Sequence, residues 1–307
     1  MYSQPLLTES KIAHTLPKIL SPAVFIADAH YMVDSTPKPA ILRTPYNDKV
    51  AHTASLPSDT PCTFDICEHS NNDQFVWYQN IELETSVAPY PRYIGENGLL
   101  GLLEHLIASP PAQIFLMGDI AHLLIGHLPS STKQHRDFLA IINKLARLCE
   151  VVYFEGNHDF GLDSALFPNV RIYPRSLQPA VFMYNDKCLF LSHGDYFIGT
   201  LYEAYIRTMN APLTLSLLKL LDILSVGYLY NAITARINAK QIYNMPMPDE
   251  VFRWFANKRM QSYKQYAKRL GISIPFGVIE GHFHIGMMTK NFIALPSFYC
   301  NQRIFVL

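Results

Sequence analysis

Five short polar motifs in this chain carry side chains of the kinds that hold metal ions in proteins. They supply, in order, Asp28 and His30 in FIADAH, Asp119 in MGDI, Asn157 and His158 in FEGNHDF, His193 in SHGD, and His282 and His284 in GHFH. Carboxylate and amide oxygens combined with imidazole nitrogens, without a cysteine thiolate, suit manganese, iron or zinc. Two such ions held close together activate water and neutralise phosphoryl oxygens. The motifs therefore predict a centre for two divalent metal ions.

The spacing within the first and last motifs places pairs of ligands on the same side of the chain. Side chains two residues apart point the same way in extended backbone, so Asp28 and His30 can share one cation. His282 and His284 repeat this spacing. A DxH triplet on its own is more often an ordinary turn at the end of a strand, and a lone histidine is more often a surface or core residue. The ordered set of five motifs favours the metal centre over these explanations.

The central motifs add a bridging carboxylate and a histidine for proton transfer. Gly118 allows close approach of the backbone in front of Asp119, whose carboxylate can bridge two cations. In the third motif, Asn157 offers a neutral amide oxygen and His158 an imidazole that can transfer a proton. The adjacent Asp159 offers a carboxylate that can orient this imidazole.

Each motif directly follows a short apolar run rich in β-branched and aromatic residues. The runs are AVFIA, QIFLM, VVYFE, CLFLS and FGVIE, and their length and composition predict buried strands. Loops that follow strand ends usually carry the functional residues of layered α/β proteins. We therefore expect an α/β fold in which the five motifs converge at one edge. A hairpin of GMMTK and NFIAL and a last strand, RIFVL, complete the predicted strands.

The composition indicates one large domain over residues 1–307 that carries two insertions. Of the 307 residues, 49% are hydrophobic, so the chain can bury a large core. The 25 basic and 25 acidic residues cancel, which leaves no overall field to attract nucleic acid. Five scattered cysteines without a CxxC pair indicate reduced thiols, and the first twenty residues lack the pattern of a signal peptide or membrane anchor. We therefore expect a cytoplasmic protein with no nucleic-acid partner.

The two insertions differ in character. Residues 31–95 are rich in Pro, Thr, Ser, Asn and Asp, which predicts an irregular segment with a short strand near residues 75–78. Residues 200–271 have apolar positions three or four apart, which predicts helices. Within them, the apolar stretch 211–230 has the length of a membrane span. A lysine and an aspartate near its centre favour a cap helix or an interfacial helix instead.

The order DxH, GD, GNHD, H and GHxH resembles that of the calcineurin-like metallophosphoesterase superfamily, and the likeness covers the chain outside the two insertions. The resemblance implies a sandwich of two mixed β-sheets flanked by helices, here with a helical lid insertion. It implies two sets of metal ligands, which are Asp28, His30, Asp119 and His284 for the first ion and Asp119, Asn157, His193 and His282 for the second. It also implies that Asp119 bridges the ions. His158 would be the catalytic histidine that meets the substrate phosphoryl or leaving group, with its ring held by Asp159.

The helical insertion carries a narrower resemblance. HGDYFIGTLYEAYIRTMNAP, an apolar helix and ITARINAKQ follow one another in a layout similar to that of the UDP-2,3-diacylglucosamine pyrophosphohydrolases of lipid A biosynthesis. In those enzymes a helical lid after the HGD motif holds acyl chains. The pair Ile125 and Gly126 also matches them. This chain departs from them at GNHD in place of GNRD, at His127 and Leu128 in place of an acidic pair, and in residues 31–95, so we expect a divergent branch.

The narrower resemblance implies a substrate and a place of action. The expected reaction is hydrolysis of the diphosphate of UDP-2,3-diacylglucosamine to UMP and 2,3-diacylglucosamine 1-phosphate. The expected cofactors are two divalent metal ions, with manganese preferred over iron or zinc. The protein would act on this lipid nucleotide as a peripheral protein on the inner face of the inner membrane. In the lid, we expect Arg236 to contact phosphate. The expected acyl-chain site is lined by Leu217, Leu220, Leu221 and Leu224. A helix packed against its own domain and a solvated basic face account for these lid residues equally well.

Two other functions remain open. The chain can be a metallophosphoesterase that acts on a phosphoprotein, a nucleotide or another phospholipid. It can also be a non-catalytic scaffold that binds membranes and carries a decayed site. A decayed site should have lost ligands, whereas every motif here keeps its full set. The sequence therefore favours the two enzyme hypotheses.

Overall fold

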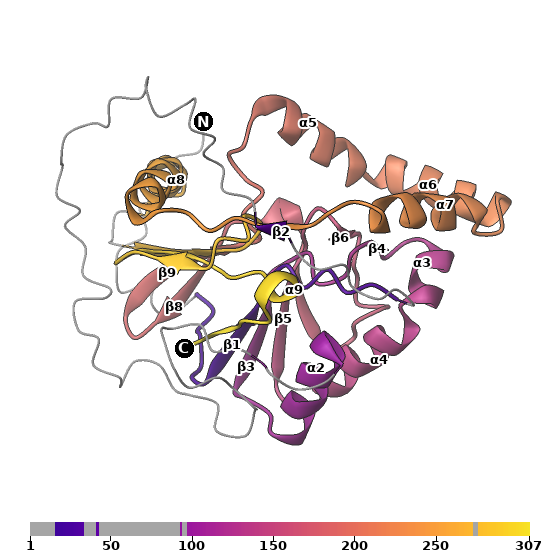
Figure 1. Ribbon diagram of the computed structural model, residues 1–307, viewed down its shortest axis with the longest axis horizontal. Helices are drawn as coiled ribbons and strands as arrows, with labels where there is room; N and C mark the ends of the chain where they lie inside the picture. Colours follow the sequence, from indigo (N-terminus) through magenta and orange to yellow (C-terminus); the bar gives the residue numbers. More distant parts are fainter. Residues whose placement is uncertain (1–15, 34–40, 43–92, 94–96, 273–275) are drawn as a thin grey trace.

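The structure is a computed structural model, and it describes residues 16–33, 41–42, 93, 97–272 and 276–307. The predicted strand near residues 75–78 lies outside the described residues. The described part is a mixed α/β structure built on two five-stranded sheets, with helices on their outer sides (Figure 1). The mixed α/β class agrees with the prediction.

The first sheet has the strand order β14–β1–β3–β5–β7. Four of its strands are parallel, and the short edge strand β14 is antiparallel to β1. The bounds are β1 (Ala23–Ile26), β3 (Gln113–Leu116), β5 (Glu150–Phe154), β7 (Val170–Tyr173) and β14 (Phe305–Val306). The predicted strands AVFIA, QIFLM and VVYFE are β1, β3 and β5. Their unbroken apolar pattern is typical of strands that are covered on both faces, and β1 and β3 are buried throughout.

The second sheet has the strand order β12–β13–β11–β9–β8. The three inner strands β9, β11 and β13 are parallel, while β8 and β12 are antiparallel to their neighbours. The bounds are β8 (Ala180–Tyr184), β9 (Lys187–Ser192), β11 (Phe276–Glu280), β12 (Met287–Met288) and β13 (Phe292–Ala294). The predicted strands CLFLS and FGVIE are β9 and β11, and the predicted hairpin is the antiparallel pair β12 and β13.

The two sheets pack face to face through an aromatic and aliphatic core. Phe25 and Phe115 from the first sheet stack with ring centroids 4.5 Å apart, and Phe115 meets Phe182 of the second sheet edge to face at 5.5 Å. Leu191 and Ile279 of the second sheet belong to the same buried cluster. Such offset and edge-to-face pairs add to the free energy gained by burying the rings. The sheets are thereby held in one rigid sandwich.

Helices cover the outer face of each sheet. α2 (Gly98–Ala108) and α4 (Arg136–Leu145) pack on the first sheet, and α4 presents Phe138 and Ile142 to it from one side of the helix. α8 (Asp249–Arg269) packs on the second sheet through a buried side that includes Phe252. Acidic residues in its first turn and basic residues in its last turn complement the helix dipole.

Short elements connect these layers. β4 pairs in parallel with β6, and β2 pairs in parallel with β10. The bounds are β2 (Ile41–Leu42), β4 (Leu124–Ile125), β6 (Asp159–Phe160), β10 (Tyr243–Asn244), α3 (Pro129–Gln134), α9 (Phe298–Asn301) and the 3-10 turn η2 (Arg175–Leu177). The pairing of β2 brings a described part of the 31–95 insertion beside the segment that follows the lid.

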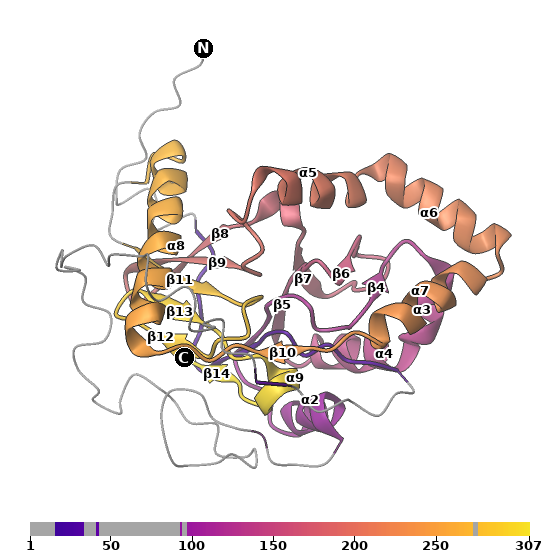
Figure 2. The same cartoon turned by 45° about the horizontal axis from the view of Figure 1, so that its top comes forward.

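The segment 200–271 is helical, as predicted, but its helices belong to two different parts of the fold. α5 (Thr200–Met209), α6 (Pro212–Leu224) and α7 (Tyr228–Asn238) form an arm that extends beyond the sheets, over β4, β6 and α3 (Figures 1 and 2). α8 instead belongs to the layer on the second sheet. The helical arm α5–α7, called the lid below, is therefore shorter than the predicted insertion, because the apolar side of α8 is buried against β9 and β11.

Among the described helices, none is long and apolar enough by itself to cross a membrane. α6 and α7 pass the same test together by length and composition, but the chain bends by 108° between them.

Candidate metal centre

The five motifs meet at one end of the sandwich. Asp28 follows β1, Asp119 follows β3 and Asn157 follows β5, so the first sheet delivers three of them. His193 follows β9 and His282 follows β11 of the second sheet. Carboxyl ends of parallel strands share one edge, which is why residues more than 250 positions apart in sequence come together here. The convergence that was predicted from the strand pattern is present in the fold.

The first group of ligand atoms consists of Asp28, His30 and His284, and these atoms lie within 4.8 Å of one another. The Nε2 atoms of His30 and His284 are 3.2 Å apart, and the latter is 3.6 Å from Asp28 Oδ1. This carboxylate oxygen is buried and accepts no hydrogen bond from the described residues. A buried anionic oxygen without a donor is costly, and a bound cation removes this cost. The group therefore fits a metal ion.

The second group consists of Asp119, His193 and His282, again within 4.8 Å of one another. His193 Nε2 lies 3.2 Å from His282 Nδ1 and 3.5 Å from Asp119 Oδ2. Asn157 Oδ1 is 3.3 Å from the same His193 nitrogen, so the amide oxygen lies beside this group. The charge of Asp119 also acts on His30 of the first group. These clusters of histidine and aspartate can hold metal ions.

The backbone at these ligands is strained. Asp28, His30, Asp119, His282 and His284 all have positive φ angles, of 48°, 42°, 52°, 69° and 53°. This left-handed conformation costs roughly 1–2 kcal/mol for a residue with a side chain, although aspartate and histidine tolerate it better than most. Such conformations persist where the surrounding structure enforces them, and they cluster at functional sites. Their concentration at the proposed ligands supports a functional site.

Two glycines allow the ligands to pack this closely. At Gly118, which has a φ of 85°, a Cβ atom would overlap the His193 imidazole. At Gly156, a Cβ atom would overlap the Asp119 carboxylate. The close approach predicted at Gly118 is therefore present, and Gly156 extends it to the third motif.

Asp159 does not hold the His158 ring, so this prediction is wrong. Its carboxylate accepts hydrogen bonds from the backbone N–H groups of Asp119 and Ile120 at 2.9 and 2.6 Å, and from the Tyr153 hydroxyl at 2.7 Å. Adjacent residues in extended backbone point to opposite sides, so Asp159 points away from the ring that precedes it. Its contacts instead fix the turn that presents Asp119.

The carbonyl of His122 takes the place that was predicted for Asp159. His158 Nδ1 donates to this oxygen at 2.6 Å, which leaves Nε2 as the free ring nitrogen. The two imidazoles also stack, with centroids 5.2 Å apart and an angle of 20° between the planes. His158 N–H donates to Asp119 Oδ1 at 2.8 Å. The catalytic candidate is thus fixed by its backbone and by one ring nitrogen.

Burial and the two aspartates set the charges of the four ligand histidines. Burial holds the pKa of His30 and of His282 well below the ordinary value, so these imidazoles are neutral and keep a lone pair for a cation. At His193, burial acts in the same direction, but the Asp119 carboxylate, together with Asp28 and Asp195, outweighs it and raises the pKa to about 10. At His284, Asp28, together with Cys300, likewise outweighs burial and raises the pKa well above the ordinary value.

We expect metal affinity to rise with pH. Without a metal, His193 and His284 hold protons that a binding cation must displace, because only the neutral imidazole is a ligand. Each displaced proton changes the binding constant by about tenfold per pH unit below the pKa of its histidine. Calorimetric titration of metal-free protein with Mn²⁺, in buffers of different ionisation enthalpy, measures the released protons. An affinity that stays constant between about pH 6 and about pH 9 would contradict this prediction.

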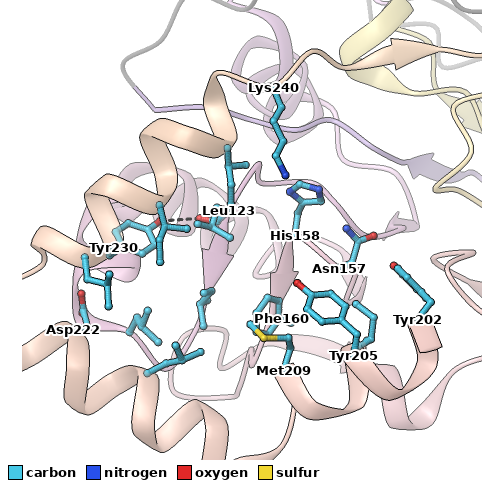
Figure 3. A pocket seen from close by; sticks show the side chains of 17 residues that line it. Leu123, Asn157, His158, Phe160, Tyr202, Tyr205, Met209, Asp222, Tyr230 and Lys240 are labelled. Carbon is cyan, nitrogen blue, oxygen red and sulfur yellow. Dashed lines mark hydrogen bonds between the residues drawn. The ribbon is translucent and has the colours of Figure 1, made fainter. Parts of the chain in front are cut away.

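A cavity of about 300 Å³ opens from His158 and runs beneath the lid (Figure 3). Its polar end is lined by Asn157, His158, Tyr202 and Lys240. Figure 3 shows the Lys240 side chain pointing toward His158. The remaining wall is largely apolar and comes from the β4 segment, β6 and the lid helices. Its residues include Leu123, Phe160, Met209, Leu218, Leu229 and Ile233. The cavity is therefore suited to a molecule with one anionic and one apolar end.

The predicted acyl-chain residues do not line this cavity. Leu217, Leu220, Leu221 and Leu224 are 54%, 52%, 37% and 71% exposed, and they lie on the outer side of α6. Leu218 lines the cavity instead. α6 is apolar on nearly all sides, so its composition could not show which side faces inward. Buried Asp222 decides this, because its carboxylate accepts a hydrogen bond from Ser130 N–H at 2.9 Å.

Arg236 is likewise exposed and does not line the cavity. Lys240, which lies just after the end of α7, is the cation that points toward His158. Two further residues of this site were missed from the sequence, His122 and Tyr202. His122 lies three positions after Asp119 in the same motif, and this proximity was the available signal. Tyr202 gave no signal, since only the folding back of α5 brings it to the cavity.

A scan of protein-family models found no match to this chain, and a search of curated proteins found none either. A functional proposal for this protein therefore rests on its residues and their geometry.

Proposed function

We propose that this protein is a dinuclear-metal phosphoesterase. The observation that carries the proposal is the pair of adjacent His and Asp groups with His158 beside them at the mouth of a cavity. Asp28, His30 and His284 would hold one divalent cation, and Asp119, Asn157, His193 and His282 the other, with Asp119 as the bridge. Two bound cations would supply an activated water and neutralise phosphoryl oxygens. The mixed oxygen and nitrogen ligands suit Mn²⁺, and also iron or zinc.

The protein side chains around this centre can orient a phosphoryl group. His158 Nε2 is free to exchange a proton with the substrate, because Nδ1 is held by the His122 carbonyl. Lys240 adds a positive charge at the same end of the cavity. Neither group needs to form a covalent bond to the substrate. The arrangement therefore supports direct hydrolysis by water.

For the substrate, we propose UDP-2,3-diacylglucosamine, hydrolysed to UMP and 2,3-diacylglucosamine 1-phosphate. Two features support this choice: the resemblance of the motifs and lid layout, and the amphipathic cavity. The diphosphate would lie at the polar end beside His158, and an acyl chain would extend along Phe160 and Leu218 beneath the lid. Burying methylene groups there stabilises binding by about 0.8 kcal/mol for each group. The two-sheet sandwich with its lid also agrees with the superfamily that the motifs resemble.

We also propose that the outer side of the lid contacts the inner face of a membrane, which makes the protein peripheral. This surface is apolar to a degree that is unusual for an exposed helix pair. Its exposed residues include Leu201, Leu213, Leu217, Leu220, Ile223, Leu224, Val226 and Tyr228. An amphipathic helix with such a side binds in the interfacial region of a bilayer. The lid would then accept a lipid substrate directly from the bilayer.

The deciding experiment is a parallel substrate assay. Purified protein loaded with Mn²⁺ is given UDP-2,3-diacylglucosamine, a phosphopeptide, soluble nucleotides and a phospholipid, and the products are separated by mass. We expect release of UMP from the lipid nucleotide at the highest kcat/KM. Efficient hydrolysis of soluble phosphomonoesters without that of the lipid nucleotide would instead support the alternative metallophosphoesterase.

Metal analysis tests the scaffold alternative. We expect about two ions per chain after loading with Mn²⁺ and gel filtration. A content below one ion per chain, together with binding to vesicles, would favour a non-catalytic membrane scaffold.

The lid makes a prediction that separates substrate binding from chemistry. Leu218→Asp should lower hydrolysis of the diacylated substrate by about tenfold or more, while hydrolysis of bis(p-nitrophenyl) phosphate is retained, because only the lipid uses the apolar wall. Leu217→Asp is the matched control, since it makes the same change at the neighbouring, outward-facing position. Assays in detergent micelles with both substrates measure the ratio of lipid hydrolysis to hydrolysis of the small phosphodiester in each variant.

Circular dichroism and metal content must first show that the Leu218→Asp protein is folded. A parallel loss of both activities in a folded, metal-loaded variant would contradict the proposed use of this wall. The Leu217→Asp protein should keep both activities in micelles and bind vesicles more weakly.

A further inference from the structure

His122 lies between the first metal group and the lid. It is 3% exposed, and each of its ring nitrogens faces one neighbour. Nδ1 is 3.3 Å from His30 Nδ1, and Nε2 is 3.2 Å from the backbone carbonyl of Ile237 in α7. The backbone carbonyl of His122 holds His158, but the His122 side chain is not one of the ligands assigned above and has no part in the proposed hydrolysis. Its two contacts nevertheless join a metal ligand to a lid helix.

A cation bound at the first group would set the direction of the hydrogen bonds in this chain. His30 presents Nε2 to His284 in the first group, so a cation bound there uses the Nε2 lone pair. The proton of neutral His30 must then be on Nδ1, which donates to His122 Nδ1. His122 in turn carries its proton on Nε2 and donates to the Ile237 carbonyl. A metal bound at His30 therefore selects the tautomers that complete a hydrogen bond to α7.

The other histidine of the first group is also tied to the segment that follows the lid. His284 Nδ1 donates to the carbonyl of Tyr243 in β10 at 2.8 Å. The segment from Ile237 to Tyr243 thus supplies a backbone carbonyl for each histidine of the first group. Tyr243 accepts from His284 directly, and Ile237 is reached from His30 through His122. Partners of this kind orient metal-binding imidazoles and raise their basicity.

A separate hydrogen bond holds α7 to the loop between β3 and β4, which also carries His122, without involving the metal group. The Tyr230 hydroxyl donates to the Leu123 carbonyl at 2.8 Å (Figure 3). Leu123 is the residue after His122, so this contact connects α7 to the same loop as the contact through His122 does. It therefore offers a matched control for the connection through His122.

We propose that His122 is a positioning residue that couples metal occupancy of the first group to docking of α7 over the cavity. This inference rests on the proposed dinuclear centre. Because coupling between two sites is reciprocal, a docked lid would raise metal affinity at the first group, and a bound metal would stabilise the docked lid. The lid would then close fully only on a metal-loaded site.

The test is hydrogen–deuterium exchange of the full chain, with and without saturating Mn²⁺, in three variants. In the unmodified protein, Mn²⁺ should slow exchange of the α7 amides by about fivefold or more, the size usual for coupled sites. His122→Phe keeps the ring that stacks on His158 but has no ring nitrogen, so most of this slowing should disappear. Peptides containing β10 should keep theirs, because His284 still reaches Tyr243 directly.

The controls separate coupling from loss of structure. Tyr230→Phe should speed exchange of α7 both with and without Mn²⁺, and leave the ratio between the two conditions unchanged. His122→Gln, which can accept from His30 and donate to Ile237, should restore part of the Mn²⁺ effect. By calorimetry, His122→Phe should weaken Mn²⁺ binding to one of the two sites by about 10- to 100-fold.

The outcomes distinguish this inference from the proposed function. An unmodified protein that binds no Mn²⁺ would overturn the dinuclear centre itself. If two ions bind but α7 exchange does not respond, or if His122→Phe keeps the full response, the coupling is overturned while the proposed phosphoesterase stands. A Tyr230→Phe protein that loses the Mn²⁺ response as His122→Phe does would show that lid docking in general, and not His122, carries it.

Discussion

Asp119→Ala is expected to remove both metal ions and to lower phosphoester hydrolysis by on the order of 10³ or more. Asp119 belongs to the second ligand group through Oδ2, which lies 3.5 Å from His193 Nε2, and its charge acts on His30 of the first group. Burial tends to raise its pKa, but the surrounding histidines, His193 foremost, hold this pKa well below the ordinary value. The site therefore keeps a negative charge here at all pH values at which it can bind a cation.

The fold should survive the loss of this side chain. Its turn is fixed from the other side by Asp159, which accepts hydrogen bonds from the backbone of Asp119 and Ile120. Asp119→Asn tests the charge alone, because its amide oxygen can still accept the hydrogen bond from His158 N–H. We expect this variant to lose metal and activity nearly as completely as the alanine variant.

Metal content by mass spectrometry, circular dichroism and turnover of the best substrate measure these effects together. Asp137→Ala, which removes an exposed carboxylate on α4, is the control and should behave like the unmodified protein. Near-normal turnover by a folded Asp119→Ala protein would remove the bridging carboxylate from the mechanism.

His158→Ala is expected to keep both metal ions and to lose on the order of 10² or more in rate. Asp28, Asp119, Asn157 and four histidines supply the ligands without it, so metal binding has no need of this ring. The backbone N–H that positions Asp119 is retained in the alanine variant. The lost function is proton exchange or charge stabilisation at the phosphoryl group.

His127→Ala is the matched control, because His127 is an exposed histidine near the same cavity and lies outside the ligand groups. Added imidazole should restore part of the activity of His158→Ala if the ring acts in proton transfer. Loss of metal in step with activity would show that His158 is a ligand, as its closeness to His30 and His122 permits.

The strands and the meeting of the candidate ligands were predictable from the sequence alone. Each buried run, such as AVFIA or QIFLM, is apolar without interruption, which is typical of strands covered on both faces. Each ligand follows such a run closely, and parallel strands end at a common edge, so convergence of the motifs needed no tertiary information. The two-residue period of extended chain predicted that Asp28 lies beside His30 and His282 beside His284, but all four residues have positive φ angles, and His282 and His284 belong to different ligand groups.

The roles of residues that depend on neighbours distant in sequence were decided by the tertiary structure. Asp159 was expected to orient His158 because it is adjacent, yet adjacency in extended chain separates side chains. The actual partner is the His122 carbonyl, which comes from another strand connection. Nothing in the sequence distinguishes His122 from an ordinary histidine. Only the packing of α7 against its loop places Ile237 on one side of the ring and His30 on the other.

The orientation of the lid could not be predicted for a different reason. α6 is apolar on almost every side, so burying either side would remove a similar apolar area from water, and the hydrophobic pattern does not choose between them. In the folded chain the buried side carries Asp222, which accepts a hydrogen bond from Ser130 N–H, so Leu218 faces the cavity and Leu217 faces outward. By itself the sequence determined which residues can hold metal ions and where they meet. Which side of the lid faces the cavity, and what connects that lid to the candidate metal ligands, depended on contacts between segments that only the folded chain brings together.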